Sequence, residues 1–480
     1  MKKINTLIVI LLLCNYSFAQ RVISRTLIGS FTKIQIDSIL NANGIPAQFL
    51  TSQYNVDVYK VIYKTVSFDS SETIASGLLA IPTNATGCLP LSSYQHGTVS
   101  RKEAAPSRFV GSEPYVALVL ASNGYVMCEP DYLGLGDSPG IHFYQHAATE
   151  ATATIDMLRS AREVCATLNV ELSGQLFLSG YSQGGHATMA AHRKIQTSLA
   201  NEFTVTASAP MSGAYDMSGT MVDVMLSNDP YPDPSYLAYI VVSWDTIYNL
   251  YNTLSDIFKS PYDTIMPPLF DGTKDLSFAN NAMPSVPKFA FVPAQLDSFQ
   301  NTTNHFFRNA LRDNDVYDWK PNCPVRMLFC HSDRSVNYLN AGVAIAKMRA
   351  NGCTDCDTIN VSNVLDHYEC AQLALLGAKS FIDPFKSTAC TVGILELTVK
   401  QMEVIISPNP STNVFELNIT GIDLSAQNTF EIIDIQGRTI RSETILNFNS
   451  HINHNLVNGI YLLKVKAGKS IAVKRLVVAN

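Results

Sequence analysis

The stretch that decides the fold runs Leu176-Phe-Leu-Ser-Gly-Tyr-Ser-Gln-Gly-Gly-His186. A short apolar run leads into Gly-x-Ser-x-Gly, and an alanine-rich helical pattern follows. This order predicts a strand, a sharp turn and a helix, with Ser182 at the tip of the turn. Gly180 and Gly184 leave room for the strand and the helix to approach each other closely. Ser182 is therefore a candidate nucleophile beside the positive end of a helix, where an oxyanion would be stabilised.

A chain with 25 glycines can contain such a motif by chance, so the surrounding sequence matters. Apolar runs typical of strands occur at 91–94, 125–129, 175–179, 204–208 and 325–330, with helical patterns such as 149–168 between them. The alternation predicts an α/β fold, a mostly parallel sheet with helices on both faces and functional loops at the carboxyl ends of the strands. Runs at 54–67 and 73–82 predict an antiparallel entry to the sheet, whereas residues 20 to about 60 otherwise hold mixed helical and loop patterns.

The first 19 residues have the pattern of a secretory signal peptide. Met1-Lys-Lys is followed by an apolar run at 7–13 and by small residues before an expected cut after Ala19. Cys14 raises the alternative of a lipoprotein, but Leu13 before it is not small, so simple cleavage is favoured. No later stretch reaches 18 apolar residues, and we expect no transmembrane helix.

Composition narrows the class of protein further. The net charge is −6 with 15% charged residues, which leaves no basic footprint for nucleic acid. Nine of the ten cysteines follow the signal peptide, and disulfides are permitted outside the cytoplasm. Cys353 and Cys356 form a Cys-x-x-Cys pair without a second pair at zinc-finger spacing, so a disulfide is favoured over zinc or redox chemistry. We expect neither a cofactor nor a metal.

A loop after the first parallel strand carries candidate oxyanion residues. His96 and Thr98 follow the run at 91–94, and a main-chain N–H from this loop can face the nucleophile. The main-chain N–H of Gln183, the residue after Ser182, would supply the second donor. The sequence leaves open whether His96 or Thr98 gives the first, and a loop histidine with a purely structural role is the alternative.

Several motifs in order resemble the secretory lipase family of α/β-hydrolases. The similarity covers about residues 56–381 and is carried by His96-Gly97, Pro130-Asp-Tyr-Leu-Gly-Leu-Gly136, His146-Ala147, Asp156-x-Leu-Arg159 and Gly180-Tyr-Ser-Gln-Gly-Gly185. The resemblance implies an α/β-hydrolase fold, a serine nucleophile and carboxylic ester substrates. His331 and Asn337 depart from the family, which commonly has Gly and Pro at these positions.

The acid and the base follow Ser182 in the order that this fold requires, Ser, then Asp or Glu, then His. Asp333 stands just past the apolar strand at 325–330 and is the candidate acid. His367 lies 34 residues further on, before a helical pattern, and is the candidate base. Asp366 is a rival acid, although a residue adjacent to the base usually points elsewhere. We expect structural roles for five other histidines, His142, His146, His186, His192 and His305.

Two further regions complete the organisation of the chain. An aromatic and apolar insertion at about 213–320 predicts a helical cap that would bind acyl chains and exclude water, although most of its side chains would only pack the cap. After about Lys400, alternating runs at 414–419, 429–435, 460–465 and 471–478 predict a small all-β sandwich. We therefore divide the chain into a signal peptide (1–19), an α/β-hydrolase domain (20–392), a linker (393–402) and a β-sandwich (403–480).

The β-sandwich resembles the C-terminal sorting domain of the type IX (Por) secretion system. The matching pieces are Ser407-Pro-Asn-Pro410, Ile433-Asp-Ile-Gln-Gly-Arg438, Leu456-Val-Asn-Gly-Ile-Tyr461 and Val473-Lys-Arg-Leu-Val-Val478. The resemblance implies export by that machinery across both membranes of a Gram-negative cell and removal of the tail. A carbohydrate-binding or spacer sandwich is the alternative, but no aromatic cluster suggests a sugar platform.

The sequence thus predicts a secreted serine hydrolase, a lipase or esterase acting on acyl esters through an acyl-enzyme. A peptidase or a polysaccharide deacetylase on the same fold stays open. So does a catalytically silent surface protein that keeps the fold for binding, although the intact order of Ser182, Asp333 and His367 argues against it.

Overall fold

The computed structural model describes residues 21–44, 51–390, 403–420, 428–434, 436–467 and 470–479. The chain forms two compact units, Met1–Thr391 and Val392–Asn480. The predicted signal peptide and the predicted linker lie outside the described residues.

The larger unit is built on a nine-stranded sheet with the order β1-β2-β3-β5-β4-β6-β7-β8-β9. The three pairs from β1 to β5 are antiparallel, and the pairs from β5 onward are parallel. The predicted mostly parallel sheet with an antiparallel entry is therefore confirmed. The strands are β1 Val22–Phe31, β2 Asn55–Val66, β3 Glu72–Thr83, β4 Leu89–Gln95, β5 Val126–Pro130, β6 Leu172–Tyr181, β7 Val205–Met211, β8 Val325–Cys330 and β9 Cys356–Ser362.

Strand β1 is a correction to the sequence analysis, which read this region as mixed helix and loop. The strand is mostly exposed, and its pairing with β2 is interrupted twice, between Val22 and Ser24 and between Leu27 and Gly29. An exposed and irregular edge strand has no buried face, so it lacks the alternation of apolar and polar residues that indicates a strand.

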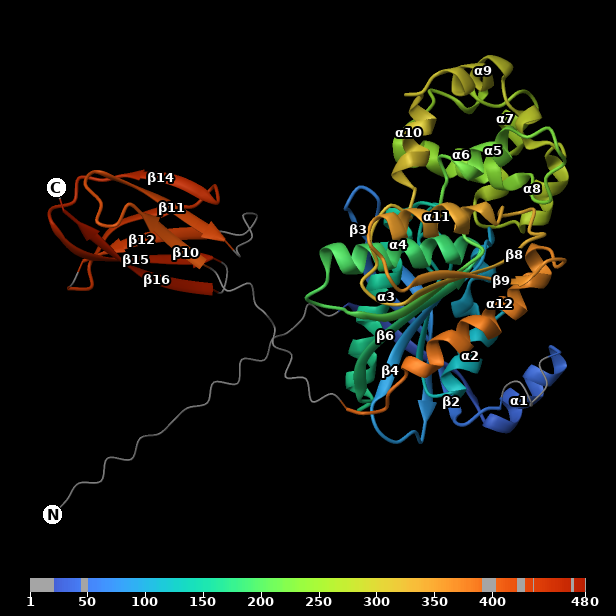
Figure 1. Ribbon diagram of the computed structural model, residues 1–480, viewed down its shortest axis with the longest axis horizontal. Helices are drawn as coiled ribbons and strands as arrows, with labels where there is room; N and C mark the ends of the chain where they lie inside the picture. Colours follow the sequence, from blue (N-terminus) through green and yellow to red (C-terminus); the bar gives the residue numbers. More distant parts are fainter. Residues whose placement is uncertain are drawn as a thin grey trace. The chain divides into compact units, whose positions relative to one another are not determined.

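Helices cover both faces of the sheet, as predicted (Figure 1). Side chains along β6 alternate between the two faces: Leu176 and Leu178 pack into one core, Phe177 into the other. The first core takes helices α3 Ala147–Thr167, α4 Gln183–Ser198 and α11 Leu339–Ala350. The second takes α1 Lys33–Ala42, α2 Pro114–Ser122 and α12 His367–Ile382. Short 3-10 turns occur at η1 Lys102–Ala104, η2 Pro106–Arg108 and η6 Asp383–Phe385.

A helical cap is inserted between β7 and β8, at the carboxyl ends of the parallel strands. Figure 1 shows its helices gathered at one end of the sheet. The cap has its own core, in which Trp244 is fully buried and donates from its ring N–H to the main-chain oxygen of Tyr144 (2.8 Å). Its elements are α5 Thr220–Leu226, α6 Ser235–Tyr248, η3 Leu254–Asp256, α7 Tyr262–Ile265, η4 Pro267–Phe270, α8 Leu276–Ala282, η5 Pro287–Ala290, α9 Pro293–Asn301 and α10 Phe306–Asp313.

Three disulfides cross-link the larger unit: Cys88–Cys390, Cys330–Cys370 and Cys353–Cys356. The last is the Cys-x-x-Cys pair, so its prediction as a disulfide is confirmed. Among the described cysteines, the free thiols belong to Cys128, Cys165 and Cys323.

The smaller unit is the predicted all-β sandwich. One sheet has the order β10-β11-β14, the other β13-β12-β15-β16, and all pairs within them are antiparallel. Phe415 and Leu417 from the first sheet share a buried core with Phe430 and Leu463 from the second. The strands are β10 Glu403–Ser407, β11 Val414–Thr420, β12 Asn428–Ile433, β13 Thr439–Thr444, β14 Asn449–Asn453, β15 Gly459–Ala467 and β16 Ser470–Val478.

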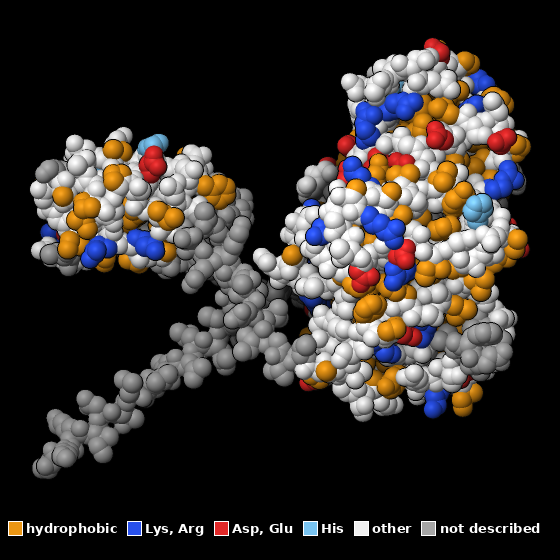
Figure 2. All heavy atoms as spheres, in the orientation of Figure 1, with side chains coloured by type: hydrophobic (Ala, Val, Ile, Leu, Met, Phe, Trp, Pro, Cys, Tyr) orange, Lys and Arg blue, Asp and Glu red, His pale blue; other side chains and the backbone are white. Residues whose placement is uncertain are grey.

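The distribution of charged side chains on the surface agrees with the low charge content of the sequence. On the face shown in Figure 2, Lys and Arg side chains are scattered among hydrophobic ones rather than gathered in one area. Across the described ranges, none of the helices has the length and apolar character needed to cross a membrane.

Candidate active site

Ser182 lies on the sharp turn between β6 and α4. Its backbone has φ 60° and ψ −120°, a conformation that residues with a side chain rarely adopt. The flanking residues must be glycines because a side chain would clash with the neighbouring main chain. A Cβ on Gly180 would lie 2.3 Å from the carbonyl oxygen of Gly184, and a Cβ on Gly184 would lie 1.8 Å from the carbonyl oxygen of Gln95. The strand and the helix therefore pack so closely that Ser182 is held at the carboxyl edge of the sheet.

Three side chains from separate elements meet at this edge. The hydroxyl of Ser182 lies 2.8 Å from Nε2 of His367, the first residue of α12. The other ring nitrogen, Nδ1, lies 2.6 Å from Oδ2 of Asp333, which follows β8. The second oxygen of Asp333 accepts the main-chain N–H groups of Ser335 (3.0 Å) and Val336 (2.8 Å). The structure thus brings together the predicted nucleophile, base and acid, all buried.

Asp366, the rival acid, is engaged elsewhere. It is exposed and caps the N-terminus of α12, where Oδ1 accepts the main-chain N–H groups of Tyr368 and Glu369, both at 2.9 Å. Its carboxylate therefore stabilises the start of the helix that carries His367.

The loop after β4 places the predicted oxyanion residues beside this turn. The main-chain N–H of Gly97 donates to Oε1 of Glu113 (3.3 Å), whereas those of Thr98 and Gln183 have no acceptor within the described residues. The imidazole of His96 is fully buried; Nδ1 lies 2.6 Å from the carbonyl oxygen of Gly97, and the ring packs on Tyr132. The His96 side chain thus shapes the loop, and the N–H groups of Thr98 and Gln183 stay free to donate.

The histidines predicted to be structural take no part in the hydrogen-bond chain of Ser182. His192 packs edge-on against Trp319, and burial lowers its pKa to about 3. His305 accepts the main-chain N–H of Phe307 and caps α10. His142 and His186 have buried polar partners described below.

Sequence reasoning missed a link between the cap and the segments that carry Asp333 and His367. Asp233, a buried cap residue, accepts hydrogen bonds from the hydroxyl groups of Ser335 and Tyr368. Ser335 follows Asp333 by two residues, and Tyr368 directly follows His367. The only available signal was the position of Asp233 in a proline-rich turn, which indicates a loop but not its partner.

An apolar pocket opens beside Ser182 under the cap. Its lining is dominated by methionine, leucine, valine and tyrosine side chains, which suit an acyl chain. The lining residues are Tyr144, Gln145, Ser182, Ala214, Met217, Met221, Val224, Met225, Tyr231, Tyr236, Leu237, Ile240, Pro287, Leu311, Ser335 and Val336.

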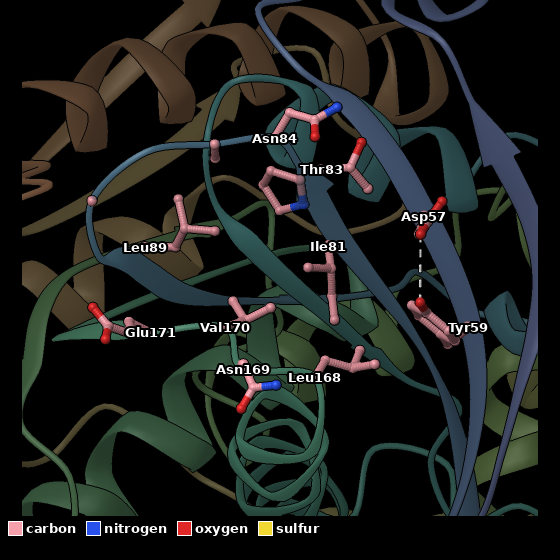
Figure 3. Close-up of a pocket in the computed structure, with 13 residues that line it drawn as sticks. Asp57, Tyr59, Ile81, Thr83, Asn84, Leu89, Leu168, Asn169, Val170 and Glu171 are labelled. Carbon is pink, nitrogen blue, oxygen red and sulfur yellow. Dashed lines mark hydrogen bonds between the residues drawn. The ribbon is translucent and has the colours of Figure 1, made fainter.

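A second pocket, shown in Figure 3, lies at the opposite ends of the strands. Leu89 at the start of β4 and Glu171 just before β6 help to line it, and Tyr59 contacts Asp57 there at 3.5 Å. None of the predicted site residues borders this pocket.

The topology, the turn at Ser182 and the cap after β7 define an α/β-hydrolase. A family model for secretory lipases matches residues 103–365, and the chain belongs to that family. The model of the secretion system C-terminal sorting domain matches residues 406–479. The protein is therefore a hydrolase acting on esters, and it is secreted or displayed at the cell surface.

Solved structures of related proteins agree. A Legionella pneumophila protein assigned to the hydrolases is 32% identical, with a TM-score of 0.72, and the match covers 76% of this chain and 98% of that one. The rice cell wall degrading esterase LipA from Xanthomonas oryzae is 31% identical, with a TM-score of 0.68 and coverage of 76% and 97%. Lipase A from Candida antarctica, at 16% identity and a TM-score of 0.57, shares the fold over 78% of this chain and 85% of its own. No match was found among curated proteins.

Proposed function

We propose that Ser182 is the nucleophile of a carboxylic ester hydrolase whose base is His367 and whose acid is Asp333. The supporting observation is the buried hydrogen-bond chain from Ser182 through His367 to Asp333. Nε2 of His367 takes the hydroxyl proton as the serine oxygen bonds to the ester carbonyl carbon. It then gives the proton to the leaving alcohol, and water hydrolyses the acyl-enzyme by the same steps. Asp333 orients the ring and stabilises its imidazolium form.

The negative oxygen of the tetrahedral intermediate would be held by the main-chain N–H groups of Thr98 and Gln183. Both lack an acceptor within the described residues, and Gln183 is the first residue of α4, whose dipole adds to the stabilisation. Loss of one such donor typically costs about 100- to 1,000-fold in kcat.

The apolar pocket under the cap supports acyl esters as the substrates. Such esters include those of lipids and of small alcohols. A second candidate is an ester on a cell wall polysaccharide, favoured by the similarity to the Xanthomonas esterase. A peptidase would share the Ser182 chemistry but would cleave amides.

A series of p-nitrophenyl esters of increasing chain length tests the proposal on the purified protein. We expect hydrolysis that rises with chain length until the pocket is filled, and its loss in Ser182→Ala. If no ester in the series is hydrolysed and peptide amides are cleaved instead, the ester assignment is overturned. Activity on acetylated polysaccharide, with little on longer acyl chains, would favour the second candidate.

For export, we propose that residues 1–19 direct the chain across the inner membrane and that the C-terminal unit engages the type IX machinery. The matched sorting domain supports this route. Mass spectrometry of the culture medium is expected to show a protein that begins near Gln20 and lacks the sandwich after about Lys400. Deletion of the sandwich should leave the enzyme inside the cell envelope; unchanged export would contradict the proposal.

A further inference from the structure

A chain of buried polar groups lies behind Ser182 and has no role in the proposed chemistry. It begins at the side chain of Gln183, whose Nε2 donates to Oε1 of Glu150 (2.8 Å) and lies 2.7 Å from Nε2 of His142. The second oxygen of Glu150 lies 2.7 Å from Nδ1 of His186. All four side chains are at most 2% exposed, so none of these contacts is shared with bulk water.

Hydrogen positions follow from the acceptors. Burial lowers the pKa of His142 to about 4, so its ring is neutral at neutral pH. Nδ1 of that ring donates to the main-chain oxygen of Leu133 (2.8 Å), which leaves Nε2 to accept from Gln183. Two acceptors, His142 and Glu150, therefore fix the amide orientation of Gln183.

His186 faces an acceptor on each side. Nδ1 meets Glu150, and Nε2 lies 2.8 Å from the main-chain oxygen of Asn314. Both contacts are satisfied when one hydrogen lies between Nδ1 and Glu150 and another lies between Nε2 and the main-chain oxygen of Asn314. The side chain of Asn314 also accepts the main-chain N–H of Ala147 at the start of α3 (2.8 Å). The pair is thus anchored to the start of α3, to α4 and to the end of α10 at the base of the cap.

The anchored residue is the one whose main-chain N–H is proposed to hold the oxyanion. The ψ angle of Ser182, −120° in an unfavourable backbone region, sets the direction of that N–H. We infer that Glu150, held by His186, is a positioning residue that locks Gln183 so that its N–H faces the oxyanion. This inference rests on the proposed function, because it assigns the residues that hold the proposed oxyanion donor in place.

Two variants of the full chain test it. Glu150→Gln keeps the volume but replaces one of the two carboxyl oxygens that contact Gln183 and His186 with an NH2 group. Gln183→Met removes the anchored amide but keeps the main-chain N–H and leaves the Glu150–His186 pair in place. A misdirected N–H donor stabilises the transition state less, whereas binding of the ground-state substrate changes little. Each variant should therefore lose about 10- to 100-fold in kcat with KM within about 2-fold of the wild type.

Affinity for an alkyl trifluoromethyl ketone separates positioning from mere packing. This inhibitor forms a tetrahedral adduct with Ser182 and places a negative oxygen on the same donors, so its binding should weaken by the same factor as kcat/KM. The double variant should be little worse than either single one, because both act through Gln183.

Glu163→Gln is the matched control on the same helix, since Glu163 accepts the main-chain N–H of Arg21 (2.9 Å), away from the site. It should keep wild-type kinetics. Folded Glu150→Gln and Gln183→Met proteins with a lower Tm but wild-type kcat and adduct affinity would overturn the inference; if Glu150→Gln does not fold, Gln183→Met alone decides. A wild-type protein without esterase activity would instead refute the proposed function.

Discussion

The phenol of Tyr181 donates a 2.5 Å hydrogen bond to the main-chain oxygen of His367. Tyr181 directly precedes Ser182, so this bond joins the turn that carries Ser182 to His367, the first residue of α12. Burial raises the pKa of Tyr181, so the phenol stays protonated and remains a donor. The ring also packs against the imidazole, with centroids 5.1 Å apart.

Tyr181→Phe should therefore lower kcat by about 2- to 10-fold, the equivalent of one ordinary hydrogen bond, with little change in KM. The reason is that the distance between Ser182 and His367 is less tightly fixed without this bond. Steady-state kinetics on a p-nitrophenyl ester measures the loss in kcat. Tyr63→Phe is the matched control, because Tyr63 is also buried and donates to a main-chain oxygen, that of Ala153 (2.9 Å). It should lower Tm without changing kcat. Equal kinetic losses in both variants would contradict a role specific to Tyr181.

The juxtaposition of Ser182, Asp333 and His367 was predictable because each residue stands at a recognisable place. Two follow apolar strands and the third begins a helix, and the fold fixes their order along the chain. The parallel sheet was predictable because its buried strands contain short apolar runs, such as Leu176-Phe177-Leu178 in β6, that alternate along the chain with helical patterns.

Contacts between distant loops could not be predicted. Asp233 and Tyr368 are 135 residues apart, and neither lies in a periodic pattern that would reveal the other. The pairing of Cys330 with Cys370 was equally hidden, because nine cysteines allow many combinations. Irregular edge strands such as β1 escape detection because their side chains face water on both sides.

Replacing the catalytic candidates tests their roles directly. Ser182→Ala and His367→Ala should each remove most of the turnover, and the double variant should be little worse than either, because the residues act as a unit. Asp333→Asn should lose about 10,000-fold in kcat. Asp366→Asn should cost less than about 1 kcal/mol in stability, because asparagine caps a helix about as well as aspartate. A larger kinetic loss in Asp366→Asn than in Asp333→Asn would show that the acid is misassigned.

The disulfide between Cys330 and Cys370 should support both stability and activity. Cys330 precedes Asp333 by three residues and Cys370 follows His367 by three, so the bond fastens the loop of Asp333 to the helix that begins at His367. A Cys330→Ala/Cys370→Ala variant is expected to lose about 4 kcal/mol in unfolding free energy, from the closed loop of 40 residues, and several-fold in kcat. The Cys353–Cys356 disulfide closes a loop of only 3 residues and does not join the segments that carry Asp333 and His367, so Cys353→Ala/Cys356→Ala should keep wild-type kcat. Equal kcat in the two double variants would contradict the fastening role.

Acidification should destabilise the larger unit through its buried histidines. His192 has a folded pKa of about 3, against about 6.5 in an unfolded chain. Between these values the unfolded state binds the extra proton, so stability falls by about 1.4 kcal/mol for each pH unit below 6.5. His192→Leu should reduce the pH dependence of the unfolding free energy by that amount. Urea unfolding at pH 7, 6 and 5 measures this dependence. Both tryptophans, Trp244 and Trp319, lie in the larger unit, so their fluorescence reports this unit alone. Parallel pH profiles for the two proteins would contradict the assignment.

Asp233 should couple the cap to the catalytic loops. One carboxylate oxygen of Asp233 accepts a hydrogen bond from the hydroxyl of Ser335, and the other accepts one from the hydroxyl of Tyr368. In Asp233→Asn the amide oxygen can replace only one of these two acceptors. We expect about a 10-fold loss in kcat/KM, because a bond to a charged acceptor is worth about 1.5–3 kcal/mol before the site relaxes. The loss should be larger for long-chain than for short-chain esters, since Tyr231 and Tyr236 next to Asp233 line the acyl pocket.

The matched control for this variant is Asp271→Asn, since Asp271 is an exposed cap residue whose carboxylate accepts the main-chain N–H and the hydroxyl of Thr273. It should keep the wild-type chain-length profile. Tyr368→Phe should reproduce part of the Asp233→Asn loss, and the double variant should fall short of the sum of the two single effects, because both remove the same hydrogen bond. If Asp233→Asn hydrolyses long and short esters as Asp271→Asn does, the bonds to Ser335 and Tyr368 hold the cap without influencing the catalytic loops.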